Sequence, residues 1–167
     1  MHNELTQVDI QKMQEEIDYR IQVLRPQLIE DVKVARAFGD LSENFEYKAA
    51  KRDKNRNESR IRYLQQMIQT AVVIDPESKA DEIGLFDRVT LLIEKTGKVQ
   101  QIQIVTTLRQ NALAGYVSKE SPVGQALLGR KAGERVLVQV NPQLSYYAVI
   151  QAVEKGQDND ALPISAY

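Results

Sequence analysis

The chain has 167 residues, of which 43% are hydrophobic and 27% are charged, a composition that is ordinary for a globular protein. Its 22 basic and 23 acidic residues give a net charge of −1, so the overall charge neither favours nor excludes a nucleic-acid partner. Without cysteine the chain has no disulfides and no thiolate metal sites, and its single histidine, His2, argues against histidine catalysis.

A first long helix is predicted from Thr6 onwards, because Thr6 and Asp9 have the spacing of a helix-capping box. Apolar residues then recur at three- and four-residue steps, which is the pattern of an amphipathic helix. The stripe consists of Ile10, Met13, Ile17, Ile21, Leu24, Leu28, Val32 and Ala35. Pro26 should bend this helix because it removes a backbone hydrogen bond, and Gly39 stands where a helix commonly ends.

A second helical pattern runs from about Ser42 to Gln69. Its apolar positions are Phe45, Tyr47, Ala49, Ala50, Ile61, Leu64 and Ile68. Because only a few residues connect the two patterns, the helices must lie antiparallel. Roughly thirty residues at ~1.5 Å per residue give an arm about 45 Å long. We therefore expect residues 1–75 to form a helical hairpin with an acidic tip at residues 39–44.

The character of the sequence changes after the hairpin. Residues 76–82 are polar and contain proline, as in a linker, and residues 83–155 carry short β-type patterns. These patterns cover residues 87–94, 99–106, 113–118, 135–140 and 146–153. Ser121-Pro122 begins one short helix. We predict a small α+β domain with an antiparallel sheet, followed by an irregular tail over residues 156–167, in which we expect little order.

Two carboxylates, Asp40 and Glu43, lie three residues apart at the hairpin tip. Oxygen ligands of this kind suit Mg²⁺, and residues at this spacing on a helical turn can converge on one ion. The same spacing also fits a capping box with Asp40 as the N-cap and Glu43 as its partner. From spacing alone the capping box is the more common arrangement, so both interpretations stay open at this point.

The second helical pattern also carries a basic run. Its members are Lys48, Lys51, Arg52, Lys54, Arg56, Arg60 and Arg62. Lys48, Arg52 and Arg56 share one helix face and could follow the phosphate backbone of RNA or DNA, although a solvated helix face has the same pattern. Since residues 51–60 contain no strongly apolar residue, we expect them to contact a ligand or partner instead of packing.

Residues 36–51, which read Arg-Ala-Phe-Gly-Asp-Leu-Ser-Glu-Asn-Phe-Glu-Tyr-Lys-Ala-Ala-Lys, closely resemble the signature of the bacterial Gre transcript cleavage factors. Arg25-Pro26 resembles a motif in the first helix of that family, and residues 72–75 resemble the end of its coiled coil. Residues 121–129 resemble its serine–proline motif. The resemblance covers nearly all of residues 5–153 and leans towards the GreA branch.

This resemblance implies an N-terminal coiled coil and a C-terminal domain of FKBP-like fold. The C-terminal domain would dock at the rim of the RNA polymerase secondary channel, and the coiled coil would reach inside. There Asp40 and Glu43 would help to hold an Mg²⁺ ion of the polymerase, which then cleaves backtracked RNA. Arg36, Lys51 and Arg52 would face the extruded 3′ end of the nascent RNA. The protein would be a monomer that has no cofactor and no enzymatic activity of its own.

The chain departs from the family pattern at two places. Arg56 and Asn57 stand where the family usually has apolar residues, so we expect a local rearrangement of the helical seam. Residues 108–113 replace the acidic stretch that precedes the serine–proline motif.

Two alternatives to a cleavage factor therefore stay open. One is a Gre-like regulator that binds the channel and inhibits or modulates the polymerase, and the other is a coiled-coil adaptor that binds protein clients. In each case we expect a cytoplasmic protein without membrane contact, because no apolar run approaches the ~20 residues of a membrane-spanning helix.

Overall fold

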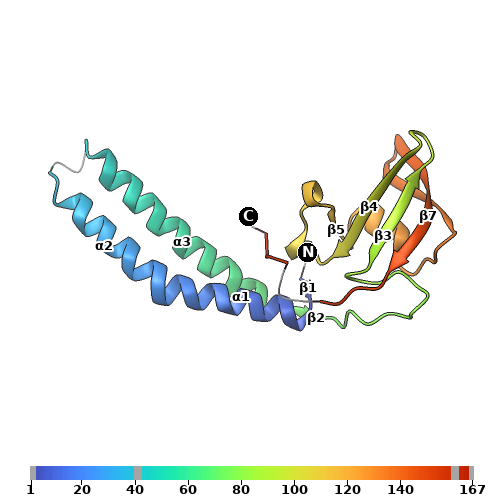
Figure 1. The fold of residues 1–167 in the computed structure, drawn as a ribbon. Coiled ribbons are helices and arrows are strands. Elements are labelled where there is room, and N and C mark those ends of the chain that lie inside the picture. The colour runs from blue at the N-terminus through green and yellow to red at the C-terminus, as the bar shows by residue number, and fades with distance from the viewer. Residues whose placement is uncertain (1–2, 40–42, 159–161, 166–167) are drawn as a thin grey trace. The chain divides into compact units, whose positions relative to one another are not determined.

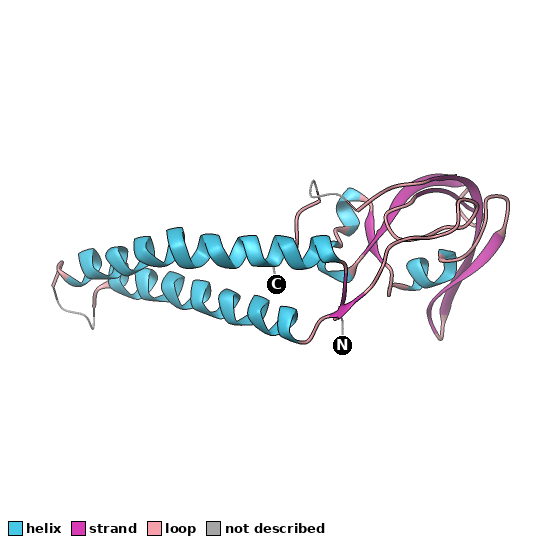
Figure 2. Ribbon diagram, turned by 90° about the horizontal axis from the view of Figure 1, so that it is seen from below, coloured by secondary structure: helices cyan, strands magenta, loops and turns pink. Residues whose placement is uncertain are grey.

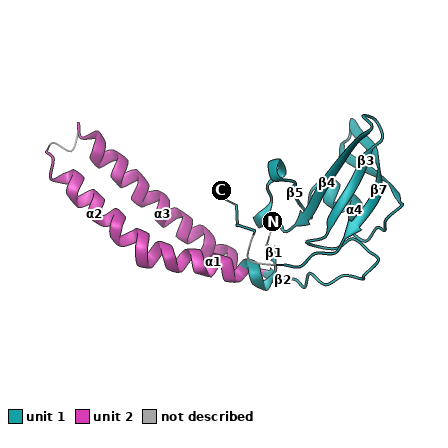
Figure 3. Ribbon diagram, viewed as in Figure 1, with its two compact units in different colours: residues 1–9, 72–167 teal, residues 10–71 magenta. Residues whose placement is uncertain are grey.

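The computed structural model describes residues 3–39, 43–158 and 162–165, which form two compact units (Figure 3). One unit comprises residues 10–71, and the other comprises residues 1–9 together with 72–167. The second grouping differs from the expected boundary, which placed all of residues 1–75 in the arm. The physical reason is a backbone pairing, because strand β1 (Glu4–Leu5) lies parallel to strand β2 (Val72–Val73).

The unit of residues 10–71 is helical (Figure 1). Its elements are α1 (Gln7–Tyr19, which begins in the other unit), the π-helical turn η1 (Arg20–Leu24), α2 (Arg25–Arg36) and α3 (Phe45–Gln69). Helices α2 and α3 lie side by side and run in opposite directions (Figures 1 and 2). The predicted apolar stripe is confirmed, since all of its residues are buried or half-buried. The fully buried apolar residues of this unit are Met13, Ile17, Ala35, Ile61 and Leu64.

A π-helical turn interrupts the first helical arm immediately before Pro26. Proline has no N–H, and its ring crowds the carbonyl group four residues earlier, so the regular α-helical pattern breaks here. The Arg25 N–H bonds instead to the Arg20 carbonyl oxygen. The buried Asn57 supports this turn, because its Nδ2 donates to the same carbonyl oxygen at 3.2 Å and its Oδ1 accepts from Arg20 Nη1 at 3.0 Å. The rearrangement expected at Asn57 is thus a widened helical turn held by a polar side chain.

Glu16, Arg20 and Arg60 form a second, partly buried polar cluster next to the contact between Arg20 and Asn57. Arg60 donates to both carboxylate oxygens of Glu16, from Nε at 2.7 Å and from Nη2 at 3.1 Å, and Arg20 Nε donates to Glu16 at 2.7 Å. Burial raises the pKa of Glu16, but the hydrogen bonds from Arg60 and Arg20 outweigh burial and hold the pKa below its usual value of 4.5. The expectation that residues 51–60 do not pack is therefore wrong, because Asn57 and Arg60 are both buried.

The other unit contains a curled, mostly antiparallel sheet (Figures 1 and 2). Its strands are β3 (Arg88–Ile93), β4 (Lys98–Val105), β5 (Tyr116–Ser118), β6 (Arg135–Asn141) and β7 (Leu144–Glu154), in the spatial order β5-β4-β3-β7-β6. The predicted β-type patterns match these strands, except that the pattern over residues 113–118 is a strand only from Tyr116 to Ser118. The predicted antiparallel sheet is confirmed for all neighbouring pairs of strands but one, since β4 and β5 are parallel. Two short 3₁₀ turns, Thr107–Arg109 and Ala112–Ala114, lie in the connection that makes this pairing possible.

Apolar side chains fill the space between this sheet and helix α4 (Pro122–Leu127). The fully buried members of this core are Ile83, Leu85, Phe86, Val89, Leu91, Ile102, Ile104, Val105, Leu127, Val136, Ala148 and Ile150. Ser121 caps α4 as predicted, with its hydroxyl accepting from the Gly124 N–H at 3.0 Å. A Cβ atom at Gly124 would lie 2.3 Å from the Ser118 carbonyl oxygen, so this position requires glycine.

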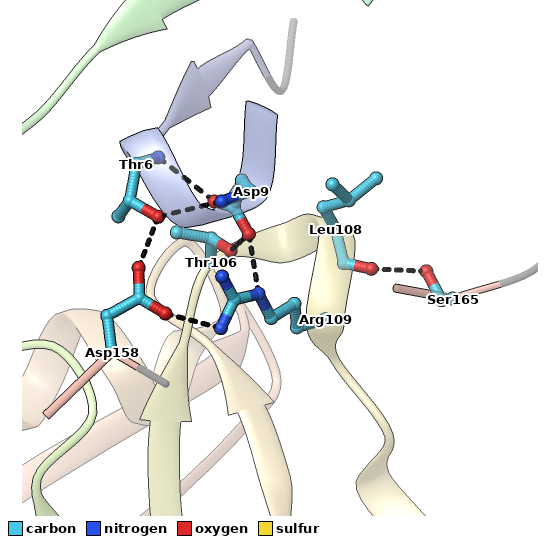
Figure 4. A network of polar contacts seen from close by, with 7 residues as sticks. All are labelled: Thr6, Asp9, Thr106, Leu108, Arg109, Asp158 and Ser165. Atoms are coloured by element: carbon cyan, nitrogen blue, oxygen red, sulfur yellow. Dashed lines mark hydrogen bonds and ion pairs between the residues drawn. The ribbon is translucent and has the colours of Figure 1, made fainter. Parts of the chain in front are cut away.

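A buried ionic network joins the first residues of the chain to the segment after β4 and to the tail (Figure 4). The predicted capping box is confirmed, since the Thr6 N–H donates to Asp9 Oδ2 at 3.0 Å and the Asp9 N–H donates to Thr6 Oγ1 at 3.2 Å. Arg109 donates from Nε to Asp9 Oδ1 at 2.6 Å and from Nη1 to Asp158 Oδ1 at 2.5 Å. The hydroxyl of Thr106 also donates to Asp9, at 3.1 Å. These contacts explain why residues 1–9 belong to the sheet-containing unit.

The tail is irregular, as predicted, in that its described residues form no helix or strand. It is nevertheless held by specific contacts. Asp158 accepts hydrogen bonds from Arg109 and from the Thr6 hydroxyl, and both the N–H and the hydroxyl of Ser165 donate to the Leu108 carbonyl oxygen at 2.7 Å. The expectation of little order over residues 156–167 is therefore wrong for these two positions.

Candidate functional site

Asn44 clamps the tip of the helical hairpin. It is the N-cap of α3, and its Oδ1 accepts from the Tyr47 N–H at 2.9 Å. Its Nδ2 donates to the Ala35 carbonyl oxygen, in the last turn of α2, at 2.6 Å. One amide side chain thus fixes the end of one helix against the start of the next. Asn44 was not predicted to be a helix cap, although an asparagine directly before a helical pattern is a recognised N-cap signal.

The position of this cap determines whether Glu43 can belong to a capping box. Because α3 begins at Phe45 with Asn44 as its N-cap, Glu43 precedes the helix and cannot be the third residue of a capping box. The capping-box interpretation of the acidic pair is therefore wrong for Glu43, whose side chain is exposed. The other member of the pair, Asp40, lies outside the described residues.

The donor set at the tip fits a metal ion only as one part of its coordination shell. Among the described residues there is no group of three or more histidine or acidic side chains that could hold a metal. An exposed carboxylate such as Glu43 is, however, the kind of ligand with which Mg²⁺ is usually held, namely one or two carboxylates together with phosphates and water. The tip therefore suits an ion whose other ligands come from elsewhere.

Two of the three predicted RNA-binding cations gather around Tyr47. The guanidinium carbon of Arg36, the last residue of α2, lies 5.5 Å from the centre of the Tyr47 ring. A side-chain hydrogen bond from Arg36 lowers the pKa of the Tyr47 phenol, and the positive charges of Lys51 and Lys54 lower it further. The structure thus brings Arg36 and Lys51 together from two different helices.

The third predicted cation, Arg52, belongs to a separate row on α3. It is one turn from Lys48 and one turn from Arg56, and all three side chains are exposed. The row ends at Phe45, where Lys48 Nζ lies 5.8 Å from the centre of the ring. Helix α3 therefore presents this row of positive charge to solvent, beginning in the helical turn that follows the tip. Such an arrangement can bind a polyanion while presenting a carboxylate to one end of it.

In the sheet-containing unit, the segment over residues 108–113 has a defined structure. Its Leu108 and Arg109 are buried, and Leu113, in the following 3₁₀ turn, is fully exposed. No helix among the described residues is both long and apolar enough to cross a membrane.

Comparison with known proteins assigns a family to both units. Residues 3–73 match the N-terminal domain of the GreA/GreB transcription elongation factors, and residues 77–155 match their C-terminal domain. Transcription elongation factor GreA of Streptococcus gordonii is 39% identical over 154 residues, which cover 90% of this chain and 94% of the relative. GreA of Caldanaerobacter subterraneus subsp. tengcongensis is 40% identical over 137 residues, covering 81% and 87%. The crystal structure of GreA factor homolog 1 of Thermus thermophilus is 25% identical, covering 93% of this chain and 100% of that one, with a TM-score of 0.40.

Proposed function

The chain belongs to the GreA/GreB family of transcription elongation factors, and from that premise we propose that it stimulates the cleavage of backtracked RNA by RNA polymerase. In this proposal the helices of residues 10–71 form a coiled coil that enters the secondary channel of the polymerase. The tip then presents Asp40 and Glu43 to the catalytic centre of the polymerase. The protein itself is an activator and not a nuclease.

The observation that carries this proposal is the position of Glu43. The Asn44 clamp joins α2 to α3 and leaves the Glu43 carboxylate exposed and outside the helix cap. A carboxylate that capped its own helix would have fewer free oxygens with which to coordinate a metal ion of a partner. The two hydrogen bonds of Asn44 also hold the start of α3 against the end of α2, and an arm that delivers a ligand to a distant site needs its two helices joined in this way.

The chemistry follows from the ligands that the tip offers. Mg²⁺, when bound, stabilises the attacking and leaving oxygens of a phosphoryl transfer. Asp40 and Glu43 would supply part of its coordination shell, and the polymerase and the RNA phosphates would supply the rest. A free carboxylate oxygen of Glu43 can also accept a hydrogen bond from the attacking water and so orient it. No nucleophile from this chain is needed.

Arg36, Lys51 and Arg52 would hold the extruded RNA by contacts with its phosphates. Contacts of this kind release counterions and therefore weaken as salt rises. The defect of an Arg52→Ala variant in cleavage should accordingly be large at low ionic strength and shrink at high ionic strength. A defect that does not depend on salt would assign Arg52 a packing role instead.

The sheet-containing unit would be the docking domain, with an FKBP-like fold, and would bind at the rim of the channel. The fully exposed Leu113 and the segment over residues 108–113 are candidates for that contact. We propose that the protein acts in the cytoplasm as a monomer bound to one polymerase.

The test is a cleavage assay on backtracked complexes of the cognate polymerase with labelled RNA. We expect wild-type protein to shorten the RNA from its 3′ end, and Asp40→Asn and Glu43→Gln to abolish this effect. Glu30→Gln is the matched control, since it removes the same charge from an exposed side chain of α2. Equal loss of activity in Glu43→Gln and Glu30→Gln would contradict the specific role of Glu43.

The two alternatives give different results in the same assay. A regulator that occupies the channel without promoting cleavage would slow elongation and leave the RNA intact. An adaptor for protein clients would neither bind the polymerase nor alter its RNA.

A further inference from the structure

Two large aromatic side chains are exposed at the hairpin tip. Phe45, the first residue of α3, is 81% exposed, and Phe38, just after α2, is 70% exposed. An aromatic ring that packed between the two helices of the hairpin would be buried. In this unit other residues fill the space between the helices. Because placing phenyl rings in water costs free energy without stabilising the fold, these rings are suited to contact another molecule.

The two rings lie next to the tip carboxylate. Phe38 and Phe45 line one open hollow of about 560 Å³ together with Glu43, Asn44 and Glu46. The Asn44 clamp ties the residue directly before Phe45 to the last turn of α2, which Phe38 follows. A group that enters the hollow would therefore be held beside Glu43.

The charge around the hollow indicates which kind of molecule would enter it. Lys48 Nζ lies 5.8 Å from the centre of the Phe45 ring, and Arg52 and Arg56 continue the same helix face at one-turn intervals. All three cations are exposed. An aromatic ring followed by a line of cations is the arrangement that binds single-stranded nucleic acid, with a base on the ring and the phosphates along the cations.

Acidic side chains limit where phosphates can lie. Glu43 and Glu46 line the hollow itself, and Asp53 adjoins Arg52 on α3. A phosphate without a bridging metal ion would be repelled from the hollow, whereas an uncharged base would not. The distribution of charge thus favours a base in the hollow and phosphates on the row of Lys48 and Arg52.

We propose that Phe45, assisted by Phe38, stacks on an unpaired base at the extruded 3′ end of the RNA and so places the adjoining backbone beside the tip carboxylate. This proposal rests on the proposed function, because it assumes that the tip meets backtracked RNA. It adds an RNA-positioning role for two aromatic residues that are distinct from the carboxylates and from the cations.

The test uses a backtracked complex whose extruded 3′ nucleotide is 5-iodouridine, which crosslinks under long-wavelength light to an aromatic ring stacked on it. Mg²⁺ is chelated so that the RNA stays intact. We expect a crosslink that maps to Phe45 or Phe38, and we expect its yield to fall at least about five-fold in Phe45→Leu, which keeps the apolar bulk but removes the aromatic face. Tyr19→Leu is the matched control, because it removes another exposed ring from the same unit, at the C-terminal end of α1.

Affinity measurements identify the partner of the ring. Phe45→Leu should bind the backtracked complex about 5- to 10-fold more weakly than wild type, the low end of the loss for one base–aromatic stack, and should bind polymerase without RNA as wild type does. Equal weakening with and without RNA would mean that Phe45 contacts the polymerase protein, and would overturn the proposal. Absence of any crosslink to Phe45 or Phe38 would also overturn it.

The cleavage assay separates this proposal from the proposed function. RNA cleavage by wild-type protein without a crosslink to either ring would refute base stacking and leave the cleavage function intact. A crosslink that depends on Phe45, without any stimulation of cleavage, would support base stacking and refute the cleavage function. Circular dichroism of each variant checks the fold, which should not change because Phe45 is exposed.

Discussion

Replacing Arg109 with alanine should strongly destabilise the unit formed by residues 1–9 and 72–167. The Arg109 side chain is completely buried and donates to Asp9 at 2.6 Å and to Asp158 at 2.5 Å. Its guanidinium carbon also lies 5.3 Å from the centre of the buried Phe86 ring. The substitution therefore removes the cation that neutralises two buried carboxylates and leaves a cavity beside Phe86.

The expected size of the effect follows from this burial. Removing one partner of a buried ion pair costs about 3–5 kcal/mol, because the remaining charge is left without compensation. A domain of this size is stable by only about 5–15 kcal/mol, so the variant should lose roughly a fifth or more of its stability. Asp158→Asn should cost less than Arg109→Ala, because the amide oxygen can still accept a hydrogen bond from Arg109 and Asp9 keeps its partner.

The measurement is amide hydrogen exchange of strands β3 and β4, which reports the opening free energy of this unit separately from the helical unit. Arg88→Ala is the matched control, since Arg88 lies 3.9 Å from Glu154 and the two side chains are 50% and 72% exposed. Its effect should stay within about 0.5 kcal/mol. Similar small effects of Arg109→Ala and Arg88→Ala would refute the argument that burial makes the Arg109 network essential.

Two further predictions concern the helical unit. Asn44→Ala should destabilise the start of α3 by about 1 kcal/mol and should reduce RNA cleavage without weakening polymerase binding, whereas Asn44→Asp keeps the cap acceptor but replaces the donor to Ala35 with a carboxylate oxygen that the Ala35 carbonyl oxygen repels. If both variants cleave RNA as wild type does, the clamp does not position the tip. Glu16, whose folded-state pKa is lowered, should stabilise the hairpin above pH 4.5 and lose this contribution as the pH falls through the lowered value. Circular dichroism at 222 nm should show a smaller acid-induced loss of helix in Glu16→Gln than in wild type. Some loss should remain, because the hydrogen bond from Arg25 also lowers the pKa of Glu58 in α3. Identical pH profiles would contradict the prediction.

Several features of the fold and the site could be read from the sequence because each depends on residues within a few positions of one another. The capping boxes and caps at Thr6 and Ser121, the apolar stripe of the first helix and the β-type patterns of the sheet are all of this kind. The signature over residues 36–51 likewise sufficed to indicate the family. The place of Glu43 at a hairpin tip follows from the same local patterns.

Other features required contacts between distant parts of the chain. Asn57 looked like a polar residue in a non-packing stretch, but it bonds to Arg20, which is 37 positions away, and so becomes buried. Phe45 looked like part of an apolar helix face, but the cap at Asn44 begins the helix so that this ring is exposed. The sequence pattern could not distinguish these cases, because helical periodicity records which residues share a face and not what that face meets.

The sequence by itself determined the helical arm, the sheet-forming segments, the acidic tip and the family, since local propensity and periodicity specify such elements. Only the tertiary structure decided that Glu4 and Leu5 pair with strand β2 and that Asp9 bonds to Arg109, 100 positions away. It also decided that the Asn44 amide ties two helices together. The physical reason is that a buried charge or backbone group must be satisfied by whichever partner the fold brings within hydrogen-bonding distance. That partner is selected by the packing of the whole unit and not by its neighbours in sequence.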